Sequence, residues 1–273
     1  MNYFEAFLLA VIQGLTEFLP VSSSAHLILF SEISGGNQNL FYDVSLHLGT
    51  LIAVMLYFKS DIKEIFRSII KDRSLIRNQL SRNLIISSIP TLILGYILVD
   101  FIDVYLRTSL IIAFTTIFFA IVLYLSTFKS QTKKDLSDIS TIDALVIGLF
   151  QSLSLIPGTS RSGITISAAL FLGFDYQTAS RFSFLLAIPT IGAIASYLLL
   201  TAEWNDLLSY TEFNLLGIFI SFLIAYATID FFIRFINRIG FLPFIIYRLI
   251  LGTFLISIDY FKKIGEKYKA PSS

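Results

Sequence analysis

Two apolar segments of the chain are each interrupted by a short polar run. Residues 145–172 read LVIGLFQSLSLIPGTSRSGITISAALFL, and residues 4–27 read FEAFLLAVIQGLTEFLPVSSSAHL. Each apolar flank is only about half as long as the roughly 20 residues that cross a bilayer. Non-helical backbone is tolerated at membrane depth only where protein or water surrounds it. We therefore expect two re-entrant helical hairpins whose broken tips meet inside the membrane.

The composition places the whole chain in a membrane. Of its 273 residues, 55% are hydrophobic and 14% are charged, whereas soluble domains carry about 25% charged residues. The net charge of +1 gives no electrostatic basis for binding nucleic acid. The absence of cysteine excludes disulfides, cysteine zinc sites and cysteine nucleophiles, and two histidines leave little for a histidine-rich metal site.

Six uninterrupted apolar segments are long enough to span the bilayer as helices. Their all-round apolarity and length favour helices over the alternating strands of a barrel. The fold class expected is an all-α polytopic membrane protein with about six transmembrane helices and two re-entrant hairpins. The six segments are Phe41–Phe58, Leu84–Val99, Leu110–Phe128, Phe182–Leu200, Phe213–Phe232 and Phe241–Ile258.

The order of these segments predicts an internal repeat within a single membrane domain of residues 1–273. Each hairpin precedes three spans, so the second half would enter the membrane upside down relative to the first. We expect a first repeat at 1–127, a basic connector at 128–139 and a second repeat at 140–273. Inverted repeats commonly hold their site near mid-membrane, at the repeat interface.

Basic residues set the expected orientation, because lysine and arginine gather in cytoplasmic loops. The segment after the first span is dense in both, the connector adds three lysines, and these loops fall on one side. That side is expected to be cytoplasmic. Four lysines of the C-terminal tail would then lie outside, and the early, densely charged loop outweighs them. The basic residues of the early loop are Lys59, Lys63, Arg67, Lys71, Arg73, Arg77 and Arg82.

Charged and polar side chains in the interrupted segments are candidate functional groups, because charge at bilayer depth costs about 2.5–3.5 kcal/mol per group. Gln13 and Glu17 are four residues apart and share one helix face. Ser22 and Ser23 precede His26 by four and three residues. Glu17 alone could also be a structural partner of an arginine, and a serine cluster after proline is often only a helix cap.

The second polar run suits an anion. Its glycines permit close backbone approach, its serines cap the helix that follows, and a helix N-terminus attracts anions. Arg161 adds a planar fork suited to phosphate oxygens. Glu17 fits beside an anion only with a cation or a proton, and Mg²⁺ typically binds one or two carboxylates plus substrate phosphates. Together these groups suggest diphosphate chemistry with a lipid tail left in the membrane.

Both runs resemble motifs of the undecaprenyl-diphosphatase (bacitracin-resistance) family. Residues 13–26, QGLTEFLPVSSSAH, are similar to its (E/Q)xxxE-plus-histidine motif, and residues 157–165, PGTSRSGIT, resemble its PGxSRSxxT motif. The resemblance covers essentially the whole chain. It implies hydrolysis of undecaprenyl diphosphate to the monophosphate carrier lipid and phosphate, with Mg²⁺ or Ca²⁺. It also implies a bacterial plasma membrane location, a site open to the extracytoplasmic side, and a homodimer.

Carried over residue by residue, the resemblance assigns roles to nine positions. Gln13 is the amide form that the pattern permits and cannot act as a base, so acid–base or metal-binding duty falls mainly on Glu17. The expected catalytic residues are Glu17, Ser23, His26 and Arg161, the expected metal ligands Gln13 and Glu17, and the expected substrate-binding residues Ser22, Ser160, Arg161, Ser162 and Thr165. Attack on the terminal phosphorus by activated water, or by Ser23 or His26 through a phosphoenzyme, remains open.

Two rival functions share some of these features. A secondary transporter or lipid flippase also uses inverted repeats and broken helices. The acid-phosphatase-like lipid phosphatases have a histidine six residues after their Ser-Arg pair, and here Ser167 stands in that position. We interpret His47 as a hydrogen bond between spans in preference to a residue that supports the site, and Arg248 as an interfacial or interspan contact. Gly49, Gly192 and Gly217 are expected to be sites of close helix packing.

Overall fold

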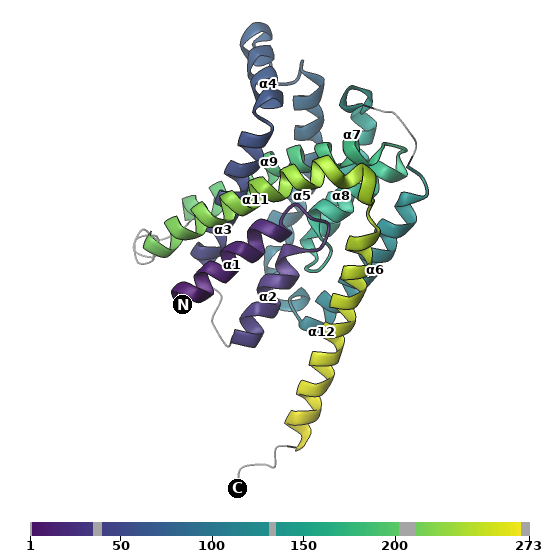
Figure 1. Ribbon diagram of the computed structural model, residues 1–273. Helices are drawn as coiled ribbons and strands as arrows, with labels where there is room; N and C mark the ends of the chain where they lie inside the picture. The colour runs from purple at the N-terminus through teal and green to yellow at the C-terminus, as the bar shows by residue number, and fades with distance from the viewer. Residues whose placement is uncertain (1, 35–39, 131–134, 202–210, 269–273) are drawn as a thin grey trace.

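The structure, a computed structural model, describes residues 2–34, 40–130, 135–201 and 211–268, and these residues form helices and connecting turns without a strand (Figure 1). This confirms the all-α fold class. In the first half, the helices are α1 (Tyr3–Thr16), α2 (Ser23–Ser34), α3 (Leu40–Tyr57), α4 (Lys59–Asp72), α5 (Gln79–Phe101), which continues as the π-helical turn η1 (Ile102–Leu106), and α6 (Ser109–Thr127).

The second half begins after the basic connector, part of which lies outside the described residues. Its helices are the 3₁₀ turn η2 (Leu136–Asp138), α7 (Thr141–Ser152), the 3₁₀ turn η3 (Leu153–Leu155), α8 (Arg161–Phe171), α9 (Tyr176–Thr201), α11 (Thr211–Ile239) and α12 (Leu242–Tyr268).

Five described helices are long and apolar enough to cross a membrane, and they overlap five of the six predicted spans. The sixth, Phe41–Phe58, coincides with α3. A bend of 77° separates α3 from the charged α4, and the pair counts as one further span if taken together. The chain is therefore a multi-pass membrane protein. The predicted cytoplasmic loop after this span is mostly the amphipathic α4.

The two interrupted segments are shorter helices, each broken near its middle. The chain leaves the helix at Glu17–Ser22 between α1 and α2, and at Ile156–Ser160 between α7 with η3 and α8. The rising helices start earlier than the sequence suggested. Arg161 was expected in the break and instead opens α8, because the backbone turns at Ser160, whose side chain caps the new helix.

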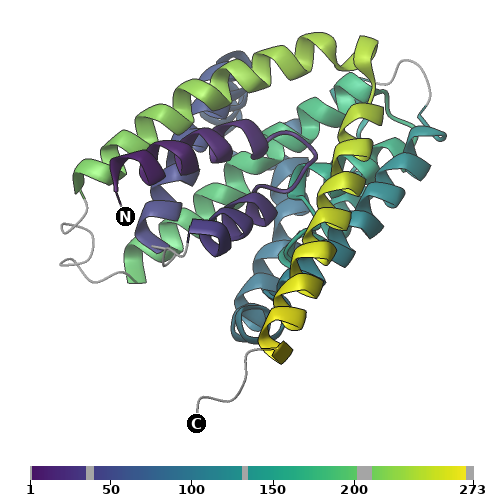
Figure 2. The same ribbon diagram turned by 60° about the horizontal axis from the view of Figure 1, so that its bottom comes forward.

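The first helix of each broken segment packs on a long helix from the other half of the chain, α1 on α11 and α7 on α5. Figures 1 and 2 show α1 running beside α11, and they also show the long helices α12 and α6 side by side. Where α7 lies against α5, Gly148 approaches the backbone of Ser87 so closely that an added Cβ would stand 2.5 Å from the Ser87 carbonyl oxygen. Because of these pairings, the two breaks lie in the interior of the bundle.

Glycine packing holds some helices together, although one predicted glycine contact is absent. A Cβ on Gly49 of α3 would collide with the Ser221 hydroxyl and the Ile218 carbonyl of α11, and Gly217 meets the ring of Tyr42. Gly192 has no atom within 4 Å of its Cβ position. The prediction that Gly192 mediates close packing was therefore wrong, because no helix among the described residues approaches that face of α9.

Candidate active site

Both breaks end in a serine held in the left-handed region of backbone space. Ser22 has φ of 73° and Ser160 has φ of 70°, a conformation that non-glycine residues rarely adopt. In each case the serine hydroxyl accepts from the backbone N–H three residues later, at 3.4 Å from Ala25 and 3.1 Å from Gly163. The two rising helices thus begin with the same strained, capped turn.

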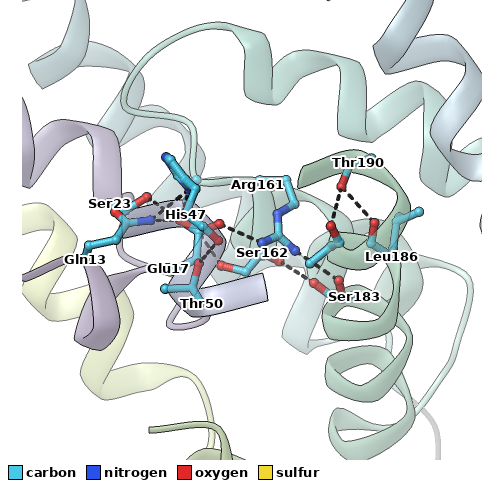
Figure 3. A network of polar contacts seen from close by, with 12 residues as sticks. Gln13, Glu17, Ser23, His47, Thr50, Arg161, Ser162, Ser183, Leu186 and Thr190 are labelled. Carbon is cyan, nitrogen blue, oxygen red and sulfur yellow. Dashed lines mark hydrogen bonds and ion pairs between the residues drawn. The ribbon is translucent and has the colours of Figure 1, made fainter. Parts of the chain in front are cut away.

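Glu17, the first residue beyond α1, is the centre of a buried polar network (Figure 3). Its Oε1 accepts from the Arg161 guanidinium at 2.8 Å. Its Oε2 accepts from the amide nitrogen of Gln13 at 2.8 Å and from the hydroxyl of Ser23 at 2.9 Å. The imidazole of His47 stands 3.6 Å from the same Oε2. One carboxylate therefore joins α1, α2, α3 and α8.

Arg161 comes from the first turn of α8, close to the positive end of that helix. One guanidinium nitrogen binds Glu17, and the other donates to the carbonyl oxygen of Ser183 in α9 at 3.1 Å. The guanidinium also lies 5.8 Å from the centre of the Phe18 ring, within range of a cation–π attraction. The side chains of Arg161 and Glu17 are 14% and 6% exposed, so this ion pair is largely withdrawn from solvent.

Two further contacts join the broken tips directly. The hydroxyl of Ser162 donates to the carbonyl oxygen of Leu19 at 2.9 Å. The guanidinium of Arg248, from α12, is completely buried and donates to carbonyl oxygens of both tips: Pro20 at 3.4 Å, and Gly158 and Thr159 at 3.0 and 2.9 Å. The kinks at Pro20 and Pro157, far apart in sequence, therefore abut, as the sequence predicted.

The tips enclose a cavity of about 220 Å³. One end is polar and contains the carboxylate and guanidinium of the network together with the strained serines. The other end is mostly apolar and is built from α9 and the turn after α7. The lining residues are Glu17, Ser22, Ser23, Ser24, Val44, His47, Thr91, Gln151, Ser154, Leu155, Ser160, Arg161, Thr190, Ile191, Ile194 and Ala195.

Some predicted site residues lie outside this lining. His26 is on α2, where its Nδ1 is 2.7 Å from the Ser22 carbonyl oxygen and its Nε2 is 2.5 Å from the Tyr247 hydroxyl. Thr165 is buried and bonds the Ser183 hydroxyl at 2.7 Å. Ser162 therefore contacts the first break, Thr165 contacts α9 and His26 contacts α12. The chemical roles predicted for these three residues remain predictions.

Sequence reasoning understated two residues that the structure brings to the site. His47 does contact another helix, as expected, but it also lines the cavity next to Glu17. Arg248 also bridges helices, and what it bridges is the pair of broken tips. In the sequence, His47 is visible as an imidazole within a predicted span, and Arg248 as a charge at membrane depth. Neither feature shows which residues the side chain contacts, because those contacts form only when the fold brings the two breaks together.

The resemblance implies a divalent cation, and the cavity offers one carboxylate for it. Within the described residues no three His, Cys, Asp or Glu side chains cluster, and Glu17 is the acidic residue of the cavity lining. This fits Mg²⁺, which uses one or two carboxylates and fills the remaining positions with water and substrate oxygens. Gln13 turns its amide nitrogen to Glu17, so a ligand role for its carbonyl oxygen remains a prediction.

The electrostatics of the junction favour an anion. Arg161 is balanced by Glu17, whereas Arg248 is bound by carbonyl oxygens and pairs with no carboxylate in the part of the chain that the structure describes. The N-termini of α2 and α8 add two partial positive charges. A ligand with several acceptor oxygens would satisfy these groups without requiring a new charge from the protein.

Comparisons with known proteins agree with this geometry. Residues 6–254 match the family described as bacitracin resistance protein BacA. The chain is 46% identical over 262 residues to an undecaprenyl-diphosphatase of Aliivibrio salmonicida (strain LFI1238), with 94% of this chain and 98% of that protein covered. It is 46% identical over 261 residues to undecaprenyl-diphosphatase 1 of Pseudoalteromonas translucida (strain TAC 125), with the same coverage. The predicted resemblance is confirmed, and the chain belongs to the bacitracin resistance protein BacA family.

Proposed function

We propose that the protein hydrolyses undecaprenyl diphosphate to undecaprenyl phosphate and inorganic phosphate. The observation that carries this proposal is the pairing of Glu17 with Arg161 where two helix N-termini meet in a cavity inside a membrane protein. The names of the two relatives support the substrate. Such a reaction would regenerate the carrier lipid for peptidoglycan synthesis and confer bacitracin resistance, in agreement with the family description.

The residues at the polar end suit a diphosphate group. In the free protein, Arg161 is held by Glu17 and by the Ser183 carbonyl. An incoming diphosphate would compete for the guanidinium and could bind it in a bidentate manner. The first amides of α2 and α8 would stabilise negative charge that accumulates in the transition state. Preorganised donors of this kind need no reorganisation when the negative charge develops.

Glu17 also organises the attack. Its Oε2 accepts from Ser23 at 2.9 Å, so a base already contacts a hydroxyl beside the expected phosphate position. Two routes use this contact: Ser23 attacks phosphorus and a phosphoenzyme forms, or a water takes its place and Glu17 accepts the proton. Rapid quenching with substrate labelled in the terminal phosphate separates the routes. Label trapped on wild-type protein and lost in Ser23→Ala supports the serine route; no trapped label supports water.

The proposal includes a divalent cation, Mg²⁺ or Ca²⁺. Glu17 would hold it together with substrate oxygens, and Gln13 is the second predicted ligand. When bound, the cation would neutralise part of the diphosphate charge.

The cavity position supports a site open to the extracytoplasmic side of a bacterial plasma membrane. At the start of α9, Arg181 bonds Asp61 of the basic helix α4 at 3.0 Å. At about 1.5 Å per residue, Thr190 of the cavity lies about 14 Å further along α9. His47 likewise lies about 15 Å before the end of α3 that precedes α4. If α4 faces the cytoplasm, as its lysines and arginines predict, the cavity lies toward the opposite side.

The apolar end of the cavity supports a lipid substrate. Leu155, Ile191, Ile194 and Ala195 line it, and Ile194 is about half exposed. A prenyl chain could therefore leave the cavity past α9 and remain among the membrane lipids. This arrangement explains how a polar head group and an apolar tail would be bound by the same small space.

The test is phosphate release by purified protein in detergent with undecaprenyl diphosphate, with and without Mg²⁺ or Ca²⁺. We expect release that requires a divalent cation and that is lost in Glu17→Ala and Arg161→Ala. Arg234→Ala is the matched control, because Arg234 forms an exposed ion pair with Asp230 away from the cavity. Absence of phosphate release by folded wild-type protein with either cation would contradict the proposal and favour a transporter or flippase.

A further inference from the structure

His47 lines the cavity in a defined orientation, and the proposed reaction assigns no role to it. Its Nδ1 is 2.9 Å from the amide nitrogen of Gln13 and 3.6 Å from Oε2 of Glu17. Its side chain is 38% exposed, in contrast to the buried Gln13 and Glu17. The Nδ1 edge of the ring is thus fixed against α1, and the residue lines the cavity.

The position of the ring hydrogen follows from the contacts of Gln13. Oε2 of Glu17 is an acceptor, so the Gln13 atom 2.8 Å away must be the amide nitrogen rather than the carbonyl oxygen. That NH₂ group has two hydrogens, one for Glu17 and one for His47. Nδ1 of His47 must therefore accept, and an imidazole whose Nδ1 accepts carries its hydrogen on Nε2.

Nε2 of His47 has no hydrogen-bond or ion-pair partner among the described residues. It is an N–H donor on a ring that lines the cavity holding Glu17, Ser23 and Arg161. Donors left without a protein partner at the edge of a cavity are costly unless water or a ligand accepts from them. We propose that the Nε2–H of His47 donates a hydrogen bond to a phosphate oxygen of the bound diphosphate, with Gln13 as the residue that positions it.

This inference rests on the proposed function for its choice of a lipid diphosphate, and it adds a substrate-binding residue from α3 to those from α2 and α8. It also gives Gln13 a positioning role that depends on the amide group of its side chain. The NH₂ group of glutamine can donate to Glu17 and to His47 together, which a carboxylate cannot do. The phosphate would then be contacted from three sides: by Arg161, by the helix N-termini and by His47.

The first test is ¹⁵N NMR of histidine-labelled protein in detergent, because the chain has only two histidines and His47→Gln assigns the signal of the other. We expect the wild-type spectrum to show Nδ1 of His47 without hydrogen and Nε2 with it. Gln13→Met, which removes the donor, should yield a mixture of tautomers. A hydrogen on Nδ1 in the wild-type protein would overturn the assignment.

The second test uses inorganic pyrophosphate as a probe of the anion site. It should shift the Nε2 signal of His47 and inhibit hydrolysis competitively. His47→Leu should weaken pyrophosphate inhibition and kcat/KM by about 10- to 100-fold, as expected for losing a hydrogen bond to a charged group. His47→Gln retains an N–H donor and should stay within about fivefold of wild type.

Ser45→Ala is the control for a purely structural effect. Ser45 precedes His47 on α3, bonds only the Phe41 carbonyl among the described contacts, and does not line the cavity. If His47→Leu and Ser45→Ala change the inhibition constant equally, or if pyrophosphate neither inhibits nor shifts the His47 signal, the proposal is wrong. If the wild-type protein releases no phosphate from the lipid while pyrophosphate still shifts this signal, the proposed hydrolysis fails and the anion contact stands.

Discussion

At the scale of single residues, the strained serines Ser22 and Ser160 show how each break is made. A residue other than glycine in the left-handed region lowers the free energy of unfolding by about 1–2 kcal/mol. A capping hydroxyl raises it by about 1 kcal/mol. The conformation ends each break at a serine whose hydroxyl accepts from the first turn of the helix that follows. Backbone strain of this kind concentrates at functional sites.

Two substitutions of Ser160 separate the effect of backbone strain on stability from the effect of the helix cap. Ser160→Ala keeps the strain and loses the cap, so its melting temperature in detergent should fall by about 2–4 °C. Ser160→Gly loses the cap but relieves the strain, and should melt within about 2 °C of wild type or above it. Equal melting of the alanine variant and wild type, with a less stable glycine variant, would contradict this account of the turn.

The sequence predicted some residues of the site well because their chemistry is conspicuous at membrane depth. Glu17 and Arg161 are charges within apolar segments, and the structure places them 2.8 Å apart. His26 has equally conspicuous chemistry, yet its ring stacks on Tyr247 of α12. The direction of a side chain at a helix start depends on where the break ends, and boundaries within Ser-rich runs are poorly defined by sequence.

At the scale of helices, the sequence predicts that close backbone contacts form at small residues, but it does not predict which of these residues form them. Small residues within spans favour packing, and Gly49 and Gly217 do pack while Gly192 does not. The difference lies in the partner helix: α11 crosses α3 at Gly49, whereas nothing covers Gly192 on α9. A sequence states which helices could pack closely, and the tertiary arrangement decides which of them do.

Gly49 and Gly192 therefore form a matched pair for a stability measurement. Gly49→Ala places a Cβ against the Ser221 hydroxyl and the Ile218 carbonyl of α11, and overpacking of this kind costs about 1–3 kcal/mol. Its melting temperature should fall by several degrees. Gly192→Ala meets no atom and improves helix propensity by about 0.5–1 kcal/mol, so it should melt at or above the wild-type temperature. Equal melting of the two variants would refute the α3–α11 contact.

Arg248 makes α12 the element that holds both breaks together. Its guanidinium satisfies carbonyl oxygens of Pro20, Gly158, Thr159 and Thr116. Removing it would leave buried acceptors unpaired, at about 1–3 kcal/mol for each. Sequence alone could not show this role, because the partners are backbone atoms and carry no signature in the residue pattern.

Two substitutions of Arg248 test whether bridging the two breaks requires the planar, forked guanidinium group. Arg248→Leu should lower the melting temperature by more than about 5 °C and reduce phosphate release at least tenfold, because neither tip keeps its anchor. Arg248→Lys keeps the charge but cannot span the same carbonyls, so it should lie between the leucine variant and wild type. Arg107→Leu, which removes an exposed arginine paired with Asp103, serves as control. Wild-type melting of Arg248→Leu would contradict the bridging role.

At the scale of the whole molecule, the first helices of the two broken segments, α1 and α7, begin beside different long helices. At the start of α1, Tyr3 bonds Glu212 in the first turn of α11 at 3.1 Å. The turns before α7 are bonded by Gln79 at the start of α5, next to the basic α4. The inverted repeat stays a prediction, and these contacts, with the matching turns at Ser22 and Ser160, support it.

Cysteine labelling in cells tests the orientation, since the chain has no cysteine of its own. Ser24→Cys is exposed at the cavity, and Lys63→Cys is exposed on α4. A membrane-impermeant thiol reagent should label Ser24→Cys in spheroplasts and reach Lys63→Cys only after the membrane is permeabilised. The reverse pattern would place the cavity on the cytoplasmic side.

The account depends on one charged pair that two distant segments bring together, and a double-mutant cycle measures that dependence. The quantity is kcat/KM for phosphate release from undecaprenyl diphosphate by wild type, Glu17→Gln, Arg161→Gln and the double variant. We predict that each single change costs about 10³-fold or more and that the double variant is within about tenfold of the weaker single variant, because residues that act as a unit are strongly non-additive. Losses that multiply in the double variant, or wild-type turnover in either single variant, would contradict a shared site.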